Sequence, residues 1–194
     1  MAKLIRDSLL TLESYSRARD GFRAQVMEHK KKRRVALGDH VTLLFEDELT
    51  IRYQLQEILR AEKVFEDAGI KEELEAYGPL IPDGGNWKVT MLIEYPDEVE
   101  RARMLAQLKG IERKVWVEVA GFSKVYAIAD EDMERENDEK TSAVHFLRFE
   151  LDAVMRAALR TGAELGMGID HAIYHVRADV SGETRDALIR DFSG

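Results

Sequence analysis

Apolar residues near the start of the chain recur with the period of an α-helix. They lie at steps of three, four or seven residues: Leu12, Tyr15, Phe22, Val26 and His29. This spacing places them on one face of a helix. It predicts a long N-terminal helix over about residues 11–35, which ends before Gly38.

The next pattern is that of a strand followed by a helix. Residues 40–46 (HVTLLFE) are mostly apolar or β-branched and predict a strand. Thr50 then suits the N-cap of a helix that reaches Ala68 and is closed by Gly69. A shorter helix is expected over residues 71–77.

Strict alternation follows a connection rich in glycine and proline, residues 77–87. In residues 86–95 (NWKVTMLIEY), one set of alternate positions is apolar: Trp87, Val89, Met91 and Ile93. The positions between them are Lys88, Thr90, Leu92 and Glu94. A period of two predicts a half-buried strand here, and the preceding connection is placed where it could line a site.

The rest of the chain repeats these two patterns. Helices are expected at 96–110 and 152–162, and strands at 114–121, 124–130 and 143–151. The tail, residues 167–192, predicts another strand and a final helix capped by Ser181. Residues of about 130–141 are strongly acidic and are expected to form a loop.

Together these elements predict an α+β fold. We expect a mainly antiparallel sheet of about five or six strands, packed by the long N-terminal helix and by the helix over residues 50–68. No internal repeat or linker divides the chain. Residues 1–194 are therefore expected to form a single domain.

Composition narrows the chemistry. The 194 residues include no cysteine, which excludes disulfides, cysteine-ligated zinc and cysteine-held iron–sulfur clusters. The formal charge of −8 argues against a general nucleic-acid-binding protein. Residues 17–34 nevertheless hold eight basic residues. They predict a solvated helix end, with an anion or nucleic-acid contact as the alternative.

The location of the protein is predicted from two further absences in the sequence. No apolar run approaches the roughly 20 residues that span a bilayer. The first ten residues also lack the apolar core of a secretory signal. We expect a cytoplasmic protein with no membrane span.

The helix over residues 50–68 carries the main candidate chemistry. Projected at about 100° per residue, Gln54, Glu57 and Glu62 fall among apolar side chains, whereas Gln56 and Arg60 fall on the solvated arc. A carboxylate removed from water without a partner costs several kcal/mol. Three interpretations are open: bridges to arginines such as Arg19, Arg23 or Arg148, a functional site, or exposure at an edge.

The five histidines add few signals of catalysis or metal binding. His145 alternates with Leu147, Phe149 and Leu151, which indicates a hydrogen-bonded histidine in the core or at its edge. His171 and His175 could share a metal if their segment were helical, but its β-branched residues favour a strand. Sequence motifs of known nucleotide-binding, hydrolase and di-iron sites are absent.

Four segments resemble an uncharacterised bacterial protein family of unknown function: residues 15–65, 73–85, 144–151 and 169–175. The stretch from Gly38 to Glu62 is the most specific part. The resemblance implies a gene neighbourhood with rubrerythrin-like and iron–sulfur oxidoreductase proteins, and so a link to peroxide or redox handling. By matching positions it singles out Glu46, Tyr53, Gln54, Glu57, Arg60 and Glu62, with Arg148 and His171 after them.

Two functional hypotheses follow. The first is a non-catalytic accessory or binding protein that works with an iron-containing redox protein. The second is an enzyme or small-ligand-binding protein that uses a cluster of Glu46, Tyr53, Gln54, Glu57, Arg60, Glu62, His145, Arg148 and His171. No cofactor motif is evident, so a metal is an alternative without a known motif behind it. The apolar girth of the helix is compatible with a homo-oligomer as well as with a core.

Overall fold

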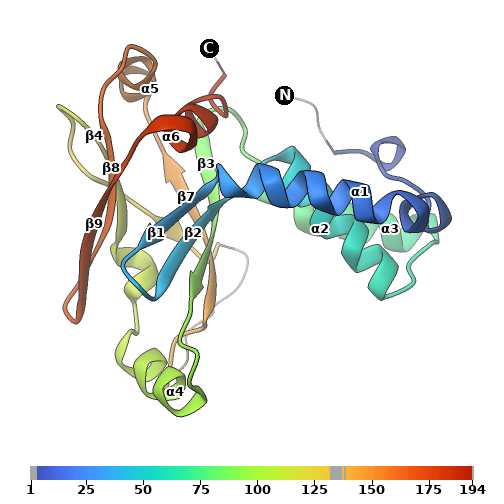
Figure 1. Cartoon of the computed structure of the whole chain (residues 1–194), viewed down its shortest axis with the longest axis horizontal. Helices are drawn as coiled ribbons and strands as arrows, with labels where there is room; N and C mark the ends of the chain where they lie inside the picture. Colours follow the sequence, from blue (N-terminus) through green and yellow to red (C-terminus); the bar gives the residue numbers. More distant parts are fainter. Residues whose placement is uncertain (1–3, 132–136, 138, 194) are drawn as a thin grey trace.

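A two-sheet β-sandwich with a projecting group of helices forms the protein (Figure 1). The computed structural model describes residues 4–131, 137 and 139–193. The projecting group, called the helical arm below, consists of α1 (Leu12–Lys31), α2 (Glu48–Ala61) and α3 (Asp67–Tyr77). No helix in the described ranges is long and apolar enough to cross a membrane.

The larger sheet has five antiparallel strands in the order β1-β2-β3-β7-β6. Their bounds are Arg34–Leu37 (β1), Val41–Phe45 (β2), Asn86–Ile93 (β3), Val144–Glu150 (β7) and Ile128–Ala129 (β6). Alternate residues of these strands face the second sheet, which buries Trp87, Val89 and Met91. The other residues, Lys88 and Thr90 among them, point to the outer face.

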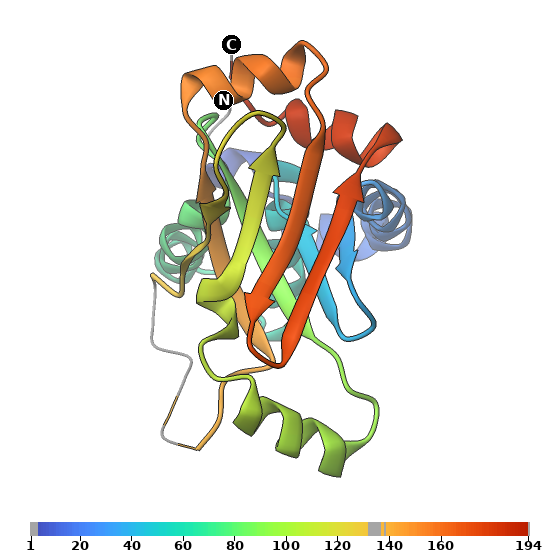
Figure 2. The same ribbon diagram turned by 90° about the vertical axis from the view of Figure 1, so that its left-hand side faces the viewer.

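The smaller sheet has four antiparallel strands in the order β5-β4-β8-β9. Their bounds are Val125–Tyr126 (β5), Val115–Val119 (β4), Leu165–His171 (β8) and Tyr174–Val180 (β9). Gly168 on β8 leaves room for the Trp116 ring, because a Cβ at this glycine would lie 2.4 Å from the indole. No helix lies over the outer face of this sheet in Figure 2.

The two sheets are joined along both sides. On one side, β5 and β6 flank Ala127, so one short segment pairs first with β4 and then with β7. On the other side, the Tyr174 hydroxyl on β9 donates to the carbonyl of Leu37 on β1 at 2.7 Å. The sandwich is therefore close to a closed barrel.

Shorter helices close the ends of the sandwich. They are α4 (Glu98–Gln107), α5 (Ala153–Arg160) and α6 (Gly182–Ile189), with 3-10 turns at Arg6–Ser8 (η1), Gly78–Leu80 (η2) and Ile111–Lys114 (η3). Helices α5 and α6 lie across one end, and α4 lies at the other (Figure 2).

Two apolar clusters stabilise the sandwich and the helical arm separately. The sandwich core includes Phe45, Trp87 and Phe149, all fully buried. The arm has its own cluster: Leu4, Leu9, Ile51, Leu55, Leu59 and Ile70. A groove at the junction of the helical arm and the sandwich therefore lies between two separately packed parts of the protein.

The predicted class, α+β with antiparallel pairing, is confirmed. Its strands form two sheets, however, rather than one sheet of five or six strands. The prediction of a single domain over residues 1–194 stays a prediction. The acidic loop of about 130–141 lies partly outside the described residues, at positions 132–136 and 138.

The predicted helix over residues 11–35 is too long at its C-terminal end. Helix α1 ends at Lys31, and Arg34–Leu37 is strand β1, paired with β2 across the turn at Gly38. Gly38 has φ +71°, which glycine adopts without strain. The hairpin supplies β1 with a partner, and this tertiary pairing overrides the helical pattern.

The predicted helix over residues 50–68 is in fact two helices. Asp47 is the N-cap of α2, because its carboxylate accepts from the Thr50 N–H, and α2 ends at Ala61. Lys63 then adopts φ +58°, which turns the chain before α3. Gly69 lies inside α3 and closes no helix.

Candidate functional site

A row of three ionisable residues crosses the outer face of the five-stranded sheet. Lys88 on β3 stands opposite Arg148 on β7. Glu46 follows β2 and continues its ladder, because its N–H donates to the Lys88 carbonyl at 2.8 Å. Neighbours in such a row have Cβ atoms about 5 Å apart. Two cations and one acid are thus aligned across three strands.

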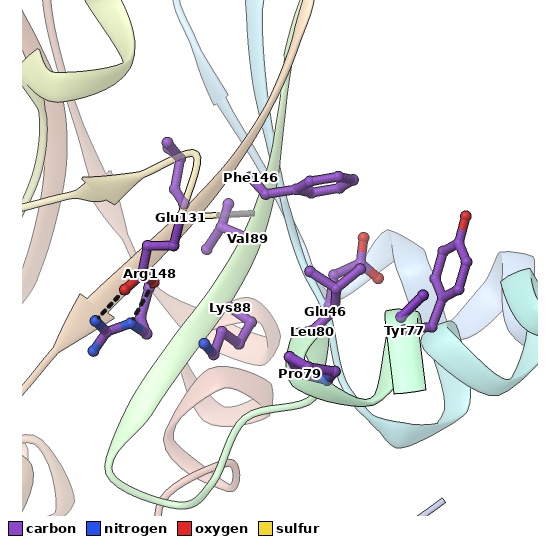
Figure 3. Close-up of a pocket in the computed structure, with 11 residues that line it drawn as sticks. Glu46, Tyr77, Pro79, Leu80, Lys88, Val89, Glu131, Phe146 and Arg148 are labelled. Atoms are coloured by element: carbon purple, nitrogen blue, oxygen red, sulfur yellow. Dashed lines mark hydrogen bonds and ion pairs between the residues drawn. The ribbon is translucent and has the colours of Figure 1, made fainter. Parts of the chain in front are cut away.

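A cavity of about 600 Å³ lies over this row, between the sheet and the end of the helical arm (Figure 3). The arm contributes Ala76 and Tyr77, and the turn η2 that follows it contributes Pro79 and Leu80. The sheet contributes Glu46, Lys88, Phe146 and Arg148, with Glu131 at the edge. Its volume is within the range of small-molecule sites. Most of the side chains that line the cavity are apolar or aromatic. The cavity therefore combines an apolar lining with a few charged groups.

Arg148 is held at the edge of the cavity by two carboxylates. Its Nε and Nη2 donate to the two oxygens of Glu131, both at 2.7 Å, and its Nη1 pairs with Glu150. The hydrogen bonds from Arg148 lower the pKa of Glu131, and the same bonds raise the pKa of Arg148. The guanidinium is therefore fixed, and one of its faces lines the cavity (Figure 3).

Lys88 is the free cation of the row. Among the residues that the structure describes, none forms an ion pair or hydrogen bond with its ammonium group. Burial lowers the pKa of Lys88, and the charge of Arg148 lowers it further, against the opposing charges of Glu131, Asp83 and Glu150. Its ammonium lies on the Arg148 side of the cavity (Figure 3).

Glu46 is a buried acid with neutral partners. Its carboxylate is held by two hydroxyl groups, Thr50 Oγ1 at 2.5 Å and Thr90 Oγ1 at 2.6 Å, and the residue is 5% exposed. Figure 3 shows the carboxylate on the Tyr77 side of the cavity. Burial raises the pKa of Tyr77, and a side-chain hydrogen bond with Gln54 opposes the rise. Gln54 therefore contacts Tyr77, a residue that lines the cavity, and does not line the cavity itself.

The other predicted residues of α2 lie apart from this cavity. Glu57 faces α1, where Arg19 binds it through Nε at 2.8 Å and Nη2 at 2.7 Å, and the Tyr15 hydroxyl donates at 2.7 Å. The hydrogen bonds from Arg19 lower the pKa of Glu57 to about 2. Tyr53 packs edge-on against Phe22 on the same side. Glu57 is therefore part of an arginine bridge.

Of three expectations about the exposure of α2 residues, two were reversed and one was met. Glu62 is exposed and caps the C-terminus of α2, because the chain turns at Lys63 before the apolar face can enclose it. Gln56, expected on the solvated arc, is 1% exposed. Its amide binds both the N–H and the carbonyl of Leu10, so the N-terminal segment covers it. Arg60 is exposed, as its arc predicted.

His145 lies on the opposite face of β7 from the cavity. It is fully buried, as expected from its alternation with apolar residues. Its Nδ1 lies 2.6 Å from Asp130 Oδ2, and its Nε2 lies 3.0 Å from both Thr141 Oγ1 and the Ser142 carbonyl. Asp130 and Glu131 therefore bind opposite faces of the same strand.

His171 lies neither at the cavity nor in the hydrogen-bonded cluster around His145. It ends β8 at a hairpin tip, where its Nε2 lies 3.2 Å from the Lys109 carbonyl. His171 pairs with Tyr174 and His175 with Asp170, so the two histidines occupy neighbouring register pairs and point to opposite faces. No group of three or more His, Asp or Glu residues suited to a metal occurs within the described ranges.

Sequence reasoning missed Lys88 and the cavity-lining residues of the arm. The alternation in residues 86–95 placed Lys88 correctly on the polar face, which was interpreted as solvent-facing. The glycine- and proline-rich connection was expected to line a site, and Pro79 and Leu80 do line the cavity. The signal that would have joined them is the register of Lys88 opposite Arg148, which a single sequence does not contain.

Comparison with known proteins agrees with the resemblance noted in the sequence. The family model described as "Protein of unknown function (DUF3501)" matches residues 3–192. The chain belongs to this DUF3501 family. A similar solved structure is a crystal structure, at 1.90 Å resolution, of a novel protein of unknown function from Burkholderia pseudomallei K96243. It is 51% identical to the DUF3501 chain, with a TM-score of 0.94 over 99% of this chain and 100% of that one. No curated protein matches.

Proposed function

We propose that the protein binds a small organic anion in the cavity between the helical arm and the five-stranded sheet. The observation that carries this proposal is Lys88, a half-buried cation without a partner in the described structure, which lines a cavity of about 600 Å³ beside Arg148. A buried charge is expected to gain a counter-charge. An anionic ligand supplies it.

The residues that line the cavity indicate the chemical character of the ligand. Phe146, Pro79 and Leu80 give the cavity an apolar side, while Glu46 offers carboxyl oxygens at its far end. Small-molecule sites commonly combine an apolar lining with a few polar groups that fix orientation. The ligand is therefore an anion with an apolar body, such as a short-chain or aromatic carboxylate.

A variant that fills the cavity tests this proposal. Ala76 is exposed on α3 and lines the cavity, so Ala76→Trp narrows it without touching the core. We expect a carboxylate from a panel that includes benzoate and butanoate to raise the melting temperature of the native protein, and Ala76→Trp to abolish the rise. Ala68→Trp, also exposed on α3 but distant from the cavity, is the control. Absence of any shift across the panel would sink the proposal.

The redox link is the second part of the proposal and rests on the family resemblance. On this view the protein is a non-catalytic, cytoplasmic accessory whose partner carries the iron. We expect tagged protein purified from its native cells to bring along a stoichiometric iron-containing protein, measured by iron content and mass spectrometry. A sample with under a tenth of an equivalent of iron would remove this part and leave the ligand-binding part untouched.

A further inference from the structure

We propose that Lys88 is a reactive amine that condenses with the carbonyl group of an aldehyde or ketone in the cavity. This inference deepens the proposed function and rests on it, since the same cavity holds the ligand. It adds that the ligand is a carbonyl compound and that the complex is covalent.

The surroundings of Lys88 distinguish it from other lysines of the chain. The ammonium groups of Lys31 and Lys124 lie 2.6 and 2.8 Å from a carboxylate oxygen, and that of Lys32 lies 3.1 Å from one. Such pairing favours the protonated amine, which is not a nucleophile. Lys88 has no such partner in the described structure and stands opposite the fixed cation Arg148.

Burial in an apolar pocket and a neighbouring cation both lower the pKa of a lysine amine and so activate it for Schiff-base formation. Both act on Lys88, and both lower its pKa. The charges of Glu131 and Glu150 oppose the effect, although hydrogen bonds hold both carboxylates on Arg148 rather than on the amine. Arg148 thus acts as a positioning residue: it binds two acids and adds its own positive charge.

The chemistry balances without a further reactant. The nitrogen of neutral Lys88 attacks the carbonyl carbon, and the new C–N bond forms as the C=O double bond opens to an alkoxide. A proton passes from nitrogen to this oxygen and gives a carbinolamine. The second hydrogen of the amine leaves with the hydroxyl group as water, which forms the C=N bond. No electrons are gained or lost.

The same cavity defines the rest of the ligand. A carboxylate on the carbonyl compound faces Arg148, and an apolar body contacts Phe146 and Leu80. The class is therefore that of oxo acids and aldehyde acids with a hydrocarbon or aromatic body. The probe 4-carboxybenzaldehyde has all three features.

Reductive trapping tests the inference. The full-length protein is mixed with 4-carboxybenzaldehyde and sodium cyanoborohydride at pH 7, and the modified lysines are mapped by peptide mass spectrometry. We expect Lys88 to be labelled severalfold faster than Lys124, since a lowered pKa enlarges the neutral, nucleophilic fraction of the amine. Lys88→Arg should lose this labelling, and Lys124→Arg should keep it.

A non-reactive analogue separates this inference from the proposed function. The analogue 4-methylbenzoate has the same ring and carboxylate but no aldehyde. If it stabilises the protein while the aldehyde labels lysines only in proportion to their exposure, the reactive lysine is refuted and the binding site stands. If neither compound acts at the cavity, both proposals fall. The mapping in the wild-type protein needs no variant to fold.

Discussion

Glu57 and Arg19 form a bidentate ion pair within the helical arm. The carboxylate receives two bonds from Arg19 and one from Tyr15, and it is roughly a quarter exposed. A bidentate arginine and a hydroxyl favour the ionised form well beyond an ordinary surface pair. This interaction joins α1 to α2.

The lowered pKa of Glu57 predicts a pH-dependent stability. The pKa is about 2 in the folded protein and about 4.3 in an unfolded chain. The contribution is therefore complete above about pH 4.5 and is lost as the pH falls towards 2. We expect Glu57→Gln to lower the free energy of unfolding by about 1–2 kcal/mol at pH 7, after allowance for solvent screening, and by roughly half as much at pH 3.

Urea denaturation at the two pH values measures this effect. Glu13→Gln is the control, because Glu13 pairs with Arg17 on the exposed side of α1 and should change stability by less than about 0.5 kcal/mol. An equal loss for Glu57→Gln at both pH values would show that packing, rather than charge, accounts for it.

At this scale the sequence predicted partners correctly and exposure incompletely. The helical projection placed Glu57 among apolar residues, and a bridge to an arginine such as Arg19 was one of the three interpretations left open; the structure shows that bridge. The projection could not show that Leu10 covers Gln56, or that Glu62 lies past the helix end, because both depend on chain segments outside the helix.

The N-terminal segment is held on α2 through Gln56. One side-chain amide binds the Leu10 N–H at 2.7 Å and the Leu10 carbonyl at 3.3 Å, while Leu4 and Leu9 join the apolar cluster of the arm. A single buried residue therefore fixes a segment that has few other backbone partners.

Removal of this amide is expected to loosen the segment. Gln56→Ala leaves two backbone groups of Leu10 without their partner, at a cost of about 1 kcal/mol because water can reach part of this exposed residue. We expect faster hydrogen exchange over residues 4–12, measured by mass spectrometry. Gln54→Ala is the control, since Gln54 is on the Tyr77 side. Unchanged exchange in Gln56→Ala would contradict the role of this contact.

The assignment of a segment as helix or strand was correct where its sequence showed a single periodicity, as in β3 and α4. It was wrong at β1, where four residues continue the helical pattern but pair with β2. It also failed at Lys63, a non-glycine residue with positive φ, because such a turn has no reliable sequence signal.

The whole molecule depends on a buried ion pair at the root of the helical arm. Arg33 follows α1 and is 3% exposed. It binds Asp191 near the C-terminus at 2.5 Å and donates to the carbonyls of Phe45 and Glu46. This arginine joins the segment after α1 to the end of β2 and to the C-terminal segment.

Breaking this pair should destabilise the entire protein. Asp191→Ala leaves the buried guanidinium with its backbone carbonyl partners and with Asp47, 3.4 Å from its Nε, as the remaining carboxylate, so we expect a loss of about 3 kcal/mol. Asp186→Ala on α6 is the control, because the Asp186 side chain is exposed and lies 3.8 Å from Arg185. Chemical denaturation followed by tryptophan fluorescence measures both. A loss near zero for Asp191→Ala would show that Asp47 alone satisfies the arginine.

The candidate cavity belongs to this largest scale, and so it was the least predictable feature. Glu46 and Arg148 were named from the sequence, but Lys88 and Tyr77 join them only once β2, β3, β7 and the arm are assembled. Sequence separation gives no register between distant strands.

The segment around Ala127 has a further consequence for the behaviour of the protein in solution. Unpaired strand edges recruit edges of other molecules and begin aggregates. Here β5 and β6 are only two residues long, and the Tyr174 hydroxyl joins the opposite edges of the two sheets. The described strands thus leave few unpaired edges to which another molecule could pair. This arrangement disfavours aggregation through edge-to-edge pairing at high protein concentration.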